Sequence, residues 1–128
     1  MKRVLFVDDE RSVLAMLERR MREHRDRWHV LFAEGAGEAL AYLQIQHVDA
    51  VVTDMRMPGI DGAALLDIVR DQYPEAVRIV LTGEVETARA TRIAALAHRV
   101  LGKPSSADAI IDALDRVFAA QAVRGPQR

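Results

Sequence analysis

Several short apolar runs of this sequence end abruptly at residues that could bind a cation or a phosphoryl group. The polar residues at the ends of four such runs are Asp8 and Asp9, Asp54, Thr82, and Lys103. Pro58, Gly59 and Gly62 follow Asp54 closely and cannot continue a strand, so the chain turns at this carboxylate. A single aspartate in such a place would be read as a turn initiator. Because polar residues also end three other runs, we interpret the set as a binding site.

Carboxylates that converge without a cation repel one another, and a hard divalent cation removes that repulsion. Mg²⁺ prefers oxygen ligands, keeps several waters, and commonly takes one or two carboxylates together with a phosphate. A lysine such as Lys103 would supply a positive charge for a phosphoryl oxygen, and the hydroxyl of Thr82 a hydrogen bond. A carboxylate can itself be the nucleophile and form an aspartyl phosphate. The set is therefore suited to phosphoryl transfer.

The spacing of apolar residues predicts the elements that hold these groups. Continuous or mixed apolar runs predict strands over residues 4–7, 28–33, 49–54, 77–81 and 98–101. Helical periodicity predicts helices from residue 12 to about 21, over 38–46, from 62 to just before Pro74, over 84–96, and from 105 onward. The last begins at Ser105 with Asp108, a capping-box pattern.

Alternation of strands and helices indicates right-handed crossovers and one parallel sheet covered on both faces, an α/β fold with a single doubly wound sheet. Strand order cannot be read from the pattern, and the flavodoxin-like order 2-1-3-4-5 is the natural choice for five such units. In that order the ends of the first, third, fourth and fifth strands lie along one edge. Ligands bind at that edge in open α/β sheets.

Size and composition are those of one ordinary globular domain. The chain has 128 residues, of which 50% are hydrophobic and 29% charged, with a net charge of −1. We expect a domain over residues 1–121 and a tail or linker over 122–128. The near-zero charge gives no argument for direct nucleic-acid or membrane binding. Absence of cysteine excludes disulfides and thiol chemistry, and no apolar run has the length of a signal or a membrane span, so we expect a cytoplasmic protein.

The sequence resembles the receiver domains of two-component response regulators over essentially its whole length. The motifs that carry the resemblance are Val7-Asp8-Asp9-Glu10, Thr53-Asp54-Met55-Arg56-Met57-Pro58-Gly59, Thr82-Gly83 and Lys103-Pro104, in the family's order and spacing. Each motif is weakly specific alone, and together they are highly specific. The sequence around residues 55–58 and 97–99 is also similar to receivers joined to HD-type output modules.

The resemblance implies a signalling switch rather than an enzyme with a separate substrate. Asp54 would accept a phosphoryl group from a histidine kinase or phosphotransfer protein. Mg²⁺ would be bound by Asp9, Asp54 and the carbonyl of Arg56, with Asp8 acting through water. Thr82 and Lys103 would hold phosphoryl oxygens. An output domain or partner protein, and a homodimer formed on phosphorylation, are the other partners it implies.

One residue departs from the family pattern. Receivers often carry Tyr or Phe three residues before the lysine, where this sequence has Val100. An aliphatic side chain cannot swing as that aromatic does, which leaves the route to output open. His98, two residues earlier, is a candidate substitute, although an ordinary surface histidine is the simpler interpretation.

Three other functions are compatible with parts of this pattern. A flavodoxin-type electron carrier shares the fold, but Asp8, Asp9 and Glu10 would repel an FMN phosphate. A phosphorylation-independent interaction module would use the fourth helix and the Val100 region as a fixed binding face, and it has no need of the complete polar set. A hydrolase is disfavoured because no separate general acid or base stands out.

Overall fold

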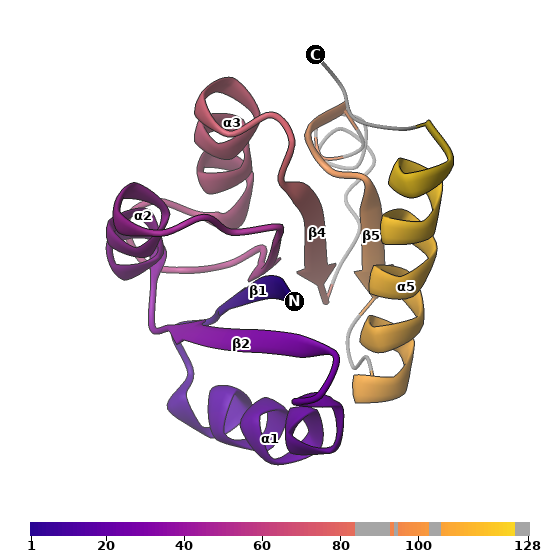
Figure 1. The fold of residues 1–128 in the computed structure, drawn as a ribbon. Helices are drawn as coiled ribbons and strands as arrows, with labels where there is room; N and C mark the ends of the chain where they lie inside the picture. The colour runs from indigo at the N-terminus through magenta and orange to yellow at the C-terminus, as the bar shows by residue number, and fades with distance from the viewer. Residues whose placement is uncertain (84–92, 94, 103–105, 125–128) are drawn as a thin grey trace.

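The computed structural model describes residues 1–83, 93, 95–102 and 106–124. Its strands are β1 (Lys2–Val7), β2 (Trp28–Ala33), β3 (Ala50–Asp54), β4 (Val77–Thr82) and β5 (Arg99–Gly102). Its helices are α1 (Arg11–Met21), the short 3₁₀ helix η1 (Arg22–His24), α2 (Ala36–Ile45), α3 (Gly62–Gln72) and α5 (Ala107–Arg124). Strands and helices alternate along the chain, as the apolar pattern predicts (Figure 1).

All five strands are parallel and lie in the order β2-β1-β3-β4-β5. The expected order is therefore confirmed. β3 lies at the centre, with Val52 beside Phe6 of β1 and Ile79 of β4. Its burial on both faces explains why its sequence is a continuous apolar run rather than an alternating one.

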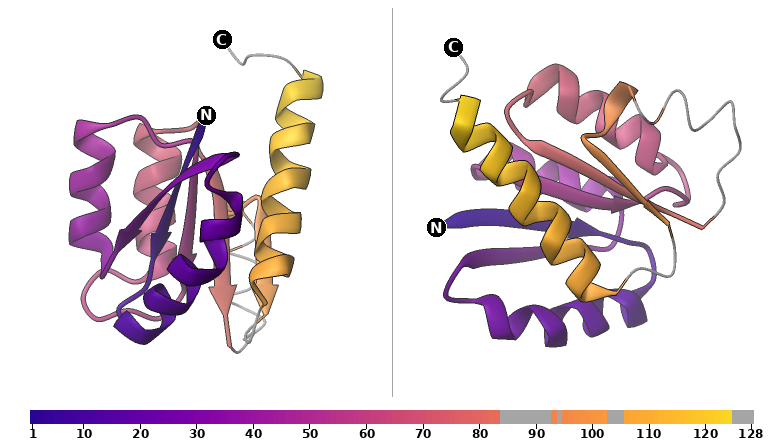
Figure 2. Two further views of the ribbon diagram at one scale, coloured as in Figure 1. Left: turned by 60° about the horizontal axis from the view of Figure 1, so that its bottom comes forward. Right: turned by 90° about the vertical axis from the view of Figure 1, so that its right-hand side faces the viewer.

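The sheet separates two apolar cores because successive side chains of each strand point to opposite faces. Leu5, Val7 and Val51 face α2 and α3, whose Leu43, Leu65, Leu66 and Val69 complete that core. On the other face, the core is formed by Val4, Phe6, Val52 and Ile79 with Leu14 and Leu17 of α1 and Ile110 and Leu114 of α5. Figure 2 shows α2 and α3 on one side of the sheet and α1 and α5 on the other.

Several element ends differ from the sequence-based expectation. α2 begins at Ala36, two residues before Glu38, and β5 covers Arg99–Gly102 rather than residues 98–101. The predicted cap residue of the last helix, Ser105, lies outside the described residues; α5 begins at Ala107, and the Ser106 hydroxyl accepts the N–H of Ala109 at 3.1 Å.

The fourth helix and the tail are described only in part. Ile93, Ala95 and Leu96 are helical, and the rest of the predicted 84–96 helix lies outside the described residues. The last helix continues to Arg124, past the expected start of the tail at residue 122. Gln121 lies within this helix and donates from its side-chain amide to the carbonyl of Glu75 at 3.2 Å. That contact joins the end of α5 to the turn before β4.

Candidate functional site

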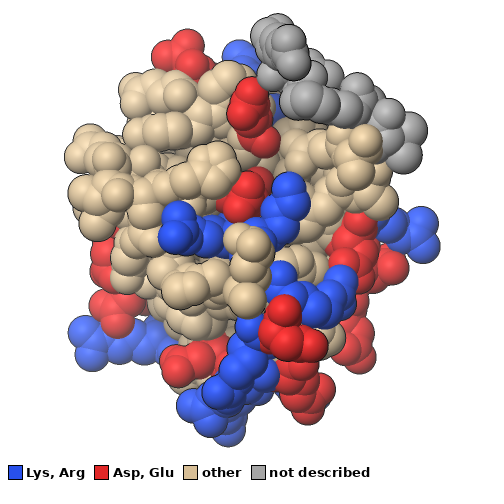
Figure 3. Space-filling view, in the orientation of Figure 1, with Lys and Arg blue, Asp and Glu red and all other residues tan. Residues whose placement is uncertain are grey.

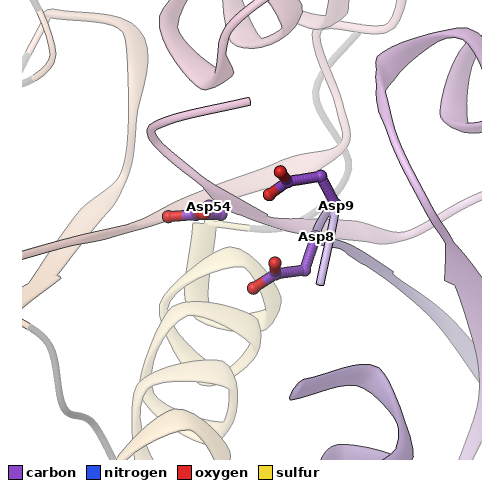
Figure 4. A group of neighbouring side chains, drawn as sticks. All are labelled: Asp8, Asp9 and Asp54. Carbon is purple, nitrogen blue, oxygen red and sulfur yellow. The ribbon is translucent and has the colours of Figure 1, made fainter. Parts of the chain in front are cut away.

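Three aspartates converge at the carboxyl edge of the sheet. Asp8 and Asp9 follow β1, and Asp54 is the last residue of the neighbouring β3. One carboxylate oxygen from each lies within 4.8 Å of the others. Figure 4 shows the side chains of Asp8 and Asp9 leaving the end of β1 beside Asp54. Parallel pairing of β1 with β3 brings together carboxylates that are more than forty residues apart in the sequence.

The backbone around Asp8 is tightly held. Its N–H donates to the carbonyl of Ala33 at 3.1 Å, which extends the β1–β2 pairing by one residue. Its Oδ1 accepts the N–H of Glu10 at 2.9 Å. Asp8 is only 2% exposed, whereas Asp9 is exposed to solvent. The pair therefore offers one inner and one outer carboxylate from the same turn.

Asp54 is also nearly inaccessible, with 7% of its surface exposed. The hydroxyl of Thr53 donates to the main-chain carbonyl of Asp54 at 3.0 Å. The next residue, Met55, donates its N–H to the carbonyl of Leu81 in β4 at 2.9 Å. The end of β3 is thus held by a side chain of the same strand and by the main chain of β4.

Of the two predicted phosphate-binding residues, the structure describes Thr82 but not Lys103. Thr82 ends β4, next to β3, and is 5% exposed. Its strand partner in β5 is Gly102. Lys103 is the next residue in the sequence and lies outside the described residues, so its predicted role is not tested by the geometry.

An open depression of about 410 Å³ adjoins the carboxylates. It is lined by Asp9, Met55, Arg56, Met57, Pro58 and Asp61. The side chain of Arg56 is exposed, whereas those of Met55 and Met57 are buried in the core beneath the loop. The buried methionines therefore anchor the loop after β3 in the core, and the exposed part of the loop borders the site.

Two functional features of this loop were not anticipated. Asp61 caps α3, with its Oδ1 accepting the N–H of Ala64 at 2.8 Å. Gly62, the first residue of α3, donates its N–H to the carbonyl of Met55 at 2.8 Å. An aspartate just before the apolar periodicity of α3 is a cap signal that could have been recognised. The hydrogen bond from Gly62 to Met55 could not be predicted from the sequence, which shows only that a glycine is present.

This donor set suits a hard divalent cation. It consists of oxygen atoms only, on carboxylates close enough to share one ion, with Asp9 exposed on the solvent side. Buried carboxylates are costly unless hydrogen bonds or a cation compensate their charge. Mg²⁺ accepts such incomplete protein coordination because it retains waters. Among the described residues, no other His, Cys, Asp and Glu side chains form a group of this kind.

Comparison with known proteins agrees with this geometry. Residues 4–115 match the family described as the response regulator receiver domain. The chain belongs to this family. Its strand order is that of a receiver domain, and a flavodoxin-type carrier is set aside.

Named relatives include regulators that are longer than this receiver. The hydrogenase transcriptional regulatory protein HoxA of Cupriavidus necator is 36% identical over 95% of this chain, which covers 25% of that protein. A response regulator receiver protein of Anaeromyxobacter is 38% identical over 88% of this chain and 47% of its own length. The chain therefore spans between a quarter and a half of these relatives.

Solved structures share the fold over nearly the whole chain. A CheY-like receiver domain protein from Methanospirillum hungatei superposes with a TM-score of 0.88 at 23% identity, covering 98% of this chain and 99% of that one. The signal receiver domain of an HD domain-containing protein from Pseudomonas fluorescens gives 0.87 at 27% identity, covering 95% and 98%. Within the described part of this receiver, no helix combines the length and apolar character needed to cross a bilayer.

The residues considered for output lie on or beside β5. Val100 is 38% exposed, so its aliphatic side chain is presented at the surface. His98 lies just before β5, at the end of that strand remote from the acidic site. Its Nδ1 accepts the N–H of Arg78 at 2.9 Å, and its own N–H donates to the Arg78 carbonyl at 2.7 Å. These bonds give His98 a structural role in starting the β4–β5 pairing.

Proposed function

We propose that this receiver is a phosphorylation-dependent switch in which Asp54 accepts a phosphoryl group from a histidine kinase or a phosphotransfer protein. The observation that carries the proposal is the convergence of Asp8, Asp9 and Asp54 beyond the central strand. Asp8 already accepts a hydrogen bond from the Glu10 N–H, and Asp9 is exposed. Asp54 is the carboxylate at the end of β3, fixed by its neighbours on both sides.

The transfer requires a carboxylate oxygen of Asp54 to form a bond to phosphorus while the donor's phosphorus–nitrogen bond breaks and the imidazole takes up a proton. The hydrogen bonds of Thr53 and Met55 position the Asp54 main chain, which supports in-line attack because positioning is most of the catalysis in phosphoryl transfer. The Thr82 hydroxyl and the Lys103 ammonium would hold phosphoryl oxygens. No second substrate is turned over in this scheme.

Mg²⁺ is the cation proposed for the site. Asp9, Asp54 and the Arg56 carbonyl would hold it, with Asp8 contributing through water. When bound, the ion would neutralise charge that develops on the phosphoryl oxygens. The carbonyl of Met55 accepts the N–H of Gly62, which supports Arg56 rather than Met55 as the main-chain donor.

Output would follow from the face formed by Thr82, the fourth helix and β5. A phosphoryl group that gains a hydrogen bond from Thr82 favours whichever conformation allows that bond. The partner would be an output domain or a separate protein, in keeping with the length of the relatives. An HD-type output module is supported by the similarity to the Pseudomonas fluorescens receiver. We further propose a cytoplasmic location and a receiver unit that continues beyond the expected boundary at residue 121 to the end of α5 at Arg124, followed by a tail or linker.

The acceptor is tested by exposing the protein to a small acyl phosphate with Mg²⁺ and measuring intact mass. Wild type is expected to gain the mass of one phosphoryl group, and Asp54→Asn to gain none, because an amide oxygen is a poor nucleophile. Asp49→Asn is a matched control, since Asp49 immediately precedes β3, at the end of the strand opposite to Asp54. If Asp54→Asn gained as much mass as wild type, the acceptor would have to be another residue.

A second candidate function is a phosphorylation-independent interaction module. The exposed Val100, which replaces the family's usual aromatic residue, favours it. Such a module would bind its partner equally well as wild type, as Asp54→Asn and in the presence of beryllofluoride. The switch requires these three affinities to differ.

A further inference from the structure

Gly62 lies against the main chain of Asp54 more closely than any side chain would permit. A Cβ atom at this position would be 2.3 Å from the carbonyl oxygen of Asp54 and 2.8 Å from the Cα of Met55. Both are backbone atoms, so neither can rotate away as the end of a flexible side chain could. Any residue other than glycine must displace the strand end, the start of α3, or both.

This contact closes the loop between β3 and α3. The Met55 N–H donates to the Leu81 carbonyl at 2.9 Å, and the Met55 carbonyl accepts the Gly62 N–H at 2.8 Å. The residue after Asp54 is therefore held by β4 at its amide and by α3 at its carbonyl. Arg56, whose carbonyl is the proposed main-chain metal ligand, comes next in the sequence.

The start of α3 has little freedom to retreat. Asp61 caps the helix through the N–H of Ala64, and Ala63, Leu65 and Leu66 are buried in the core. Glycine in a helix is about 1 kcal/mol less favourable than alanine. Helix propensity thus gives no reason for Gly62, and the approach to Asp54 does.

We propose that Gly62 is a positioning residue for the metal site, an inference that rests on the proposed function. Its missing side chain lets the loop close on the Asp54 carbonyl, and this closure sets the relative positions of the Asp54 carboxylate and the Arg56 carbonyl. These two ligands flank Met55, so a displacement at Met55 moves both. The effect is transmitted through the backbone, and Gly62 itself need not touch the ion.

The test compares Gly62→Ala with Gly37→Ala by Mg²⁺ titration calorimetry, after circular dichroism and thermal unfolding have established that each variant is folded. Gly37 lies in α2, is exposed, and has no atom within 4 Å of a Cβ built on it. Gly62→Ala is expected to bind Mg²⁺ about tenfold or more weakly, as is common when a group supporting a metal ligand is disturbed. Gly37→Ala is expected to bind as wild type does.

Mg²⁺ affinity separates positioning from a merely structural role. A structural role would lower the thermal stability of Gly62→Ala and leave the Mg²⁺ affinity of the folded protein unchanged. A folded Gly62→Ala with wild-type affinity would overturn the inference and leave the proposed function standing. Failure of wild type to bind Mg²⁺ would overturn the proposed function and this inference with it.

Gly59→Ala provides a second route if Gly62→Ala does not fold. Gly59 has a φ of +77°, which side chains rarely adopt, and no atom lies within 4 Å of a Cβ built there. The substitution strains the same loop without blocking the contact with Asp54. Because the strain falls between Arg56 and Gly62, weaker Mg²⁺ binding is expected, and an affinity equal to that of wild type would overturn the claim that closure of this loop sets the positions of the metal ligands.

Discussion

At the scale of single residues, the acidic site combines carboxylates in different environments. Asp8 and Asp54 are almost completely buried, whereas Asp9 reaches solvent beside the open depression. Without a cation, three carboxylates within 4.8 Å of one another destabilise the folded chain by mutual repulsion. With a cation, the same arrangement becomes a binding site. Loss of one carboxylate should therefore stabilise the cation-free protein and weaken cation binding.

Asp9→Ala tests this opposition. We expect the variant to bind Mg²⁺ at least about tenfold more weakly because a charged oxygen ligand is lost. Its unfolding free energy without Mg²⁺ should equal or slightly exceed that of wild type, because repulsion is relieved. Calorimetry measures the first and urea denaturation the second. Glu10→Ala is the control, since its side chain is not part of the converging group, and an unchanged affinity in Asp9→Ala would contradict the metal assignment.

At the scale of elements, Arg78 ties three segments together at the edge remote from the site. Its guanidinium donates to the carbonyls of Leu96 at 2.6 Å, Pro74 at 3.2 Å and Ala76 at 3.1 Å. Burial lowers the pKa of Arg78, and the nearby charge of Arg70 lowers it further, but an arginine remains protonated at neutral pH. Together with the His98 bonds, this residue holds the end of the helical segment at Leu96 to the start of the β4–β5 pair.

We expect Arg78→Met to lower the unfolding free energy by about 1–3 kcal/mol, because carbonyls that accept from a charged donor lose their partner. Arg70→Met is the matched control. Arg70 is exposed and makes a 3.8 Å ion pair with Asp67 and a 3.4 Å bond to Ala95, so its loss should cost about 0.5 kcal/mol or less. Urea denaturation of both variants gives the comparison. Equal losses would show that the three carbonyl bonds of Arg78 contribute no more than surface contacts.

At the scale of the whole molecule, the basic residues around the end of α1 are interspersed with acidic ones. Five arginines follow one another around the end of α1, at positions 19, 20, 22, 25 and 27. Arg22 pairs with Glu18 at 3.7 Å, and Arg27 pairs with Asp115 of α5 and lies over the ring of Trp28. In Figure 3 acidic and basic side chains alternate over the lower part of the molecule. This pattern supports a solvated surface rather than a docking patch for a polyanion.

The global response to phosphorylation should begin at Thr82. We expect beryllofluoride with Mg²⁺ to shift the amide resonances of residues 82–86 most strongly, because the new hydrogen bond forms at the Thr82 hydroxyl. Val100 cannot act as an aromatic switch, so its own shifts should be smaller. Sedimentation of the same samples tests whether a homodimer forms. Large shifts at His98 and Val100 with none near Thr82 would contradict this route, and Asp54→Asn treated identically is the control.

The sequence by itself determined the identity and alternation of the elements, because side-chain period follows backbone geometry locally. It also determined which residues end the strands, and hence the candidates Asp8, Asp9, Asp54 and Thr82. The convergence of the first three follows once parallel pairing is assumed. These features depend on neighbours along the chain and on rules common to all parallel sheets.

Only the tertiary structure decided the contacts between distant segments. The sequence supports the order β2-β1-β3-β4-β5 only by analogy with other five-unit sheets, since strand pairing depends on which faces pack together. The cap at Ser106, the guanidinium bonds of Arg78 and the approach of Gly62 to Asp54 were likewise unpredicted. Each depends on small differences in distance between backbone segments, which the packing of both cores sets and which no local pattern encodes.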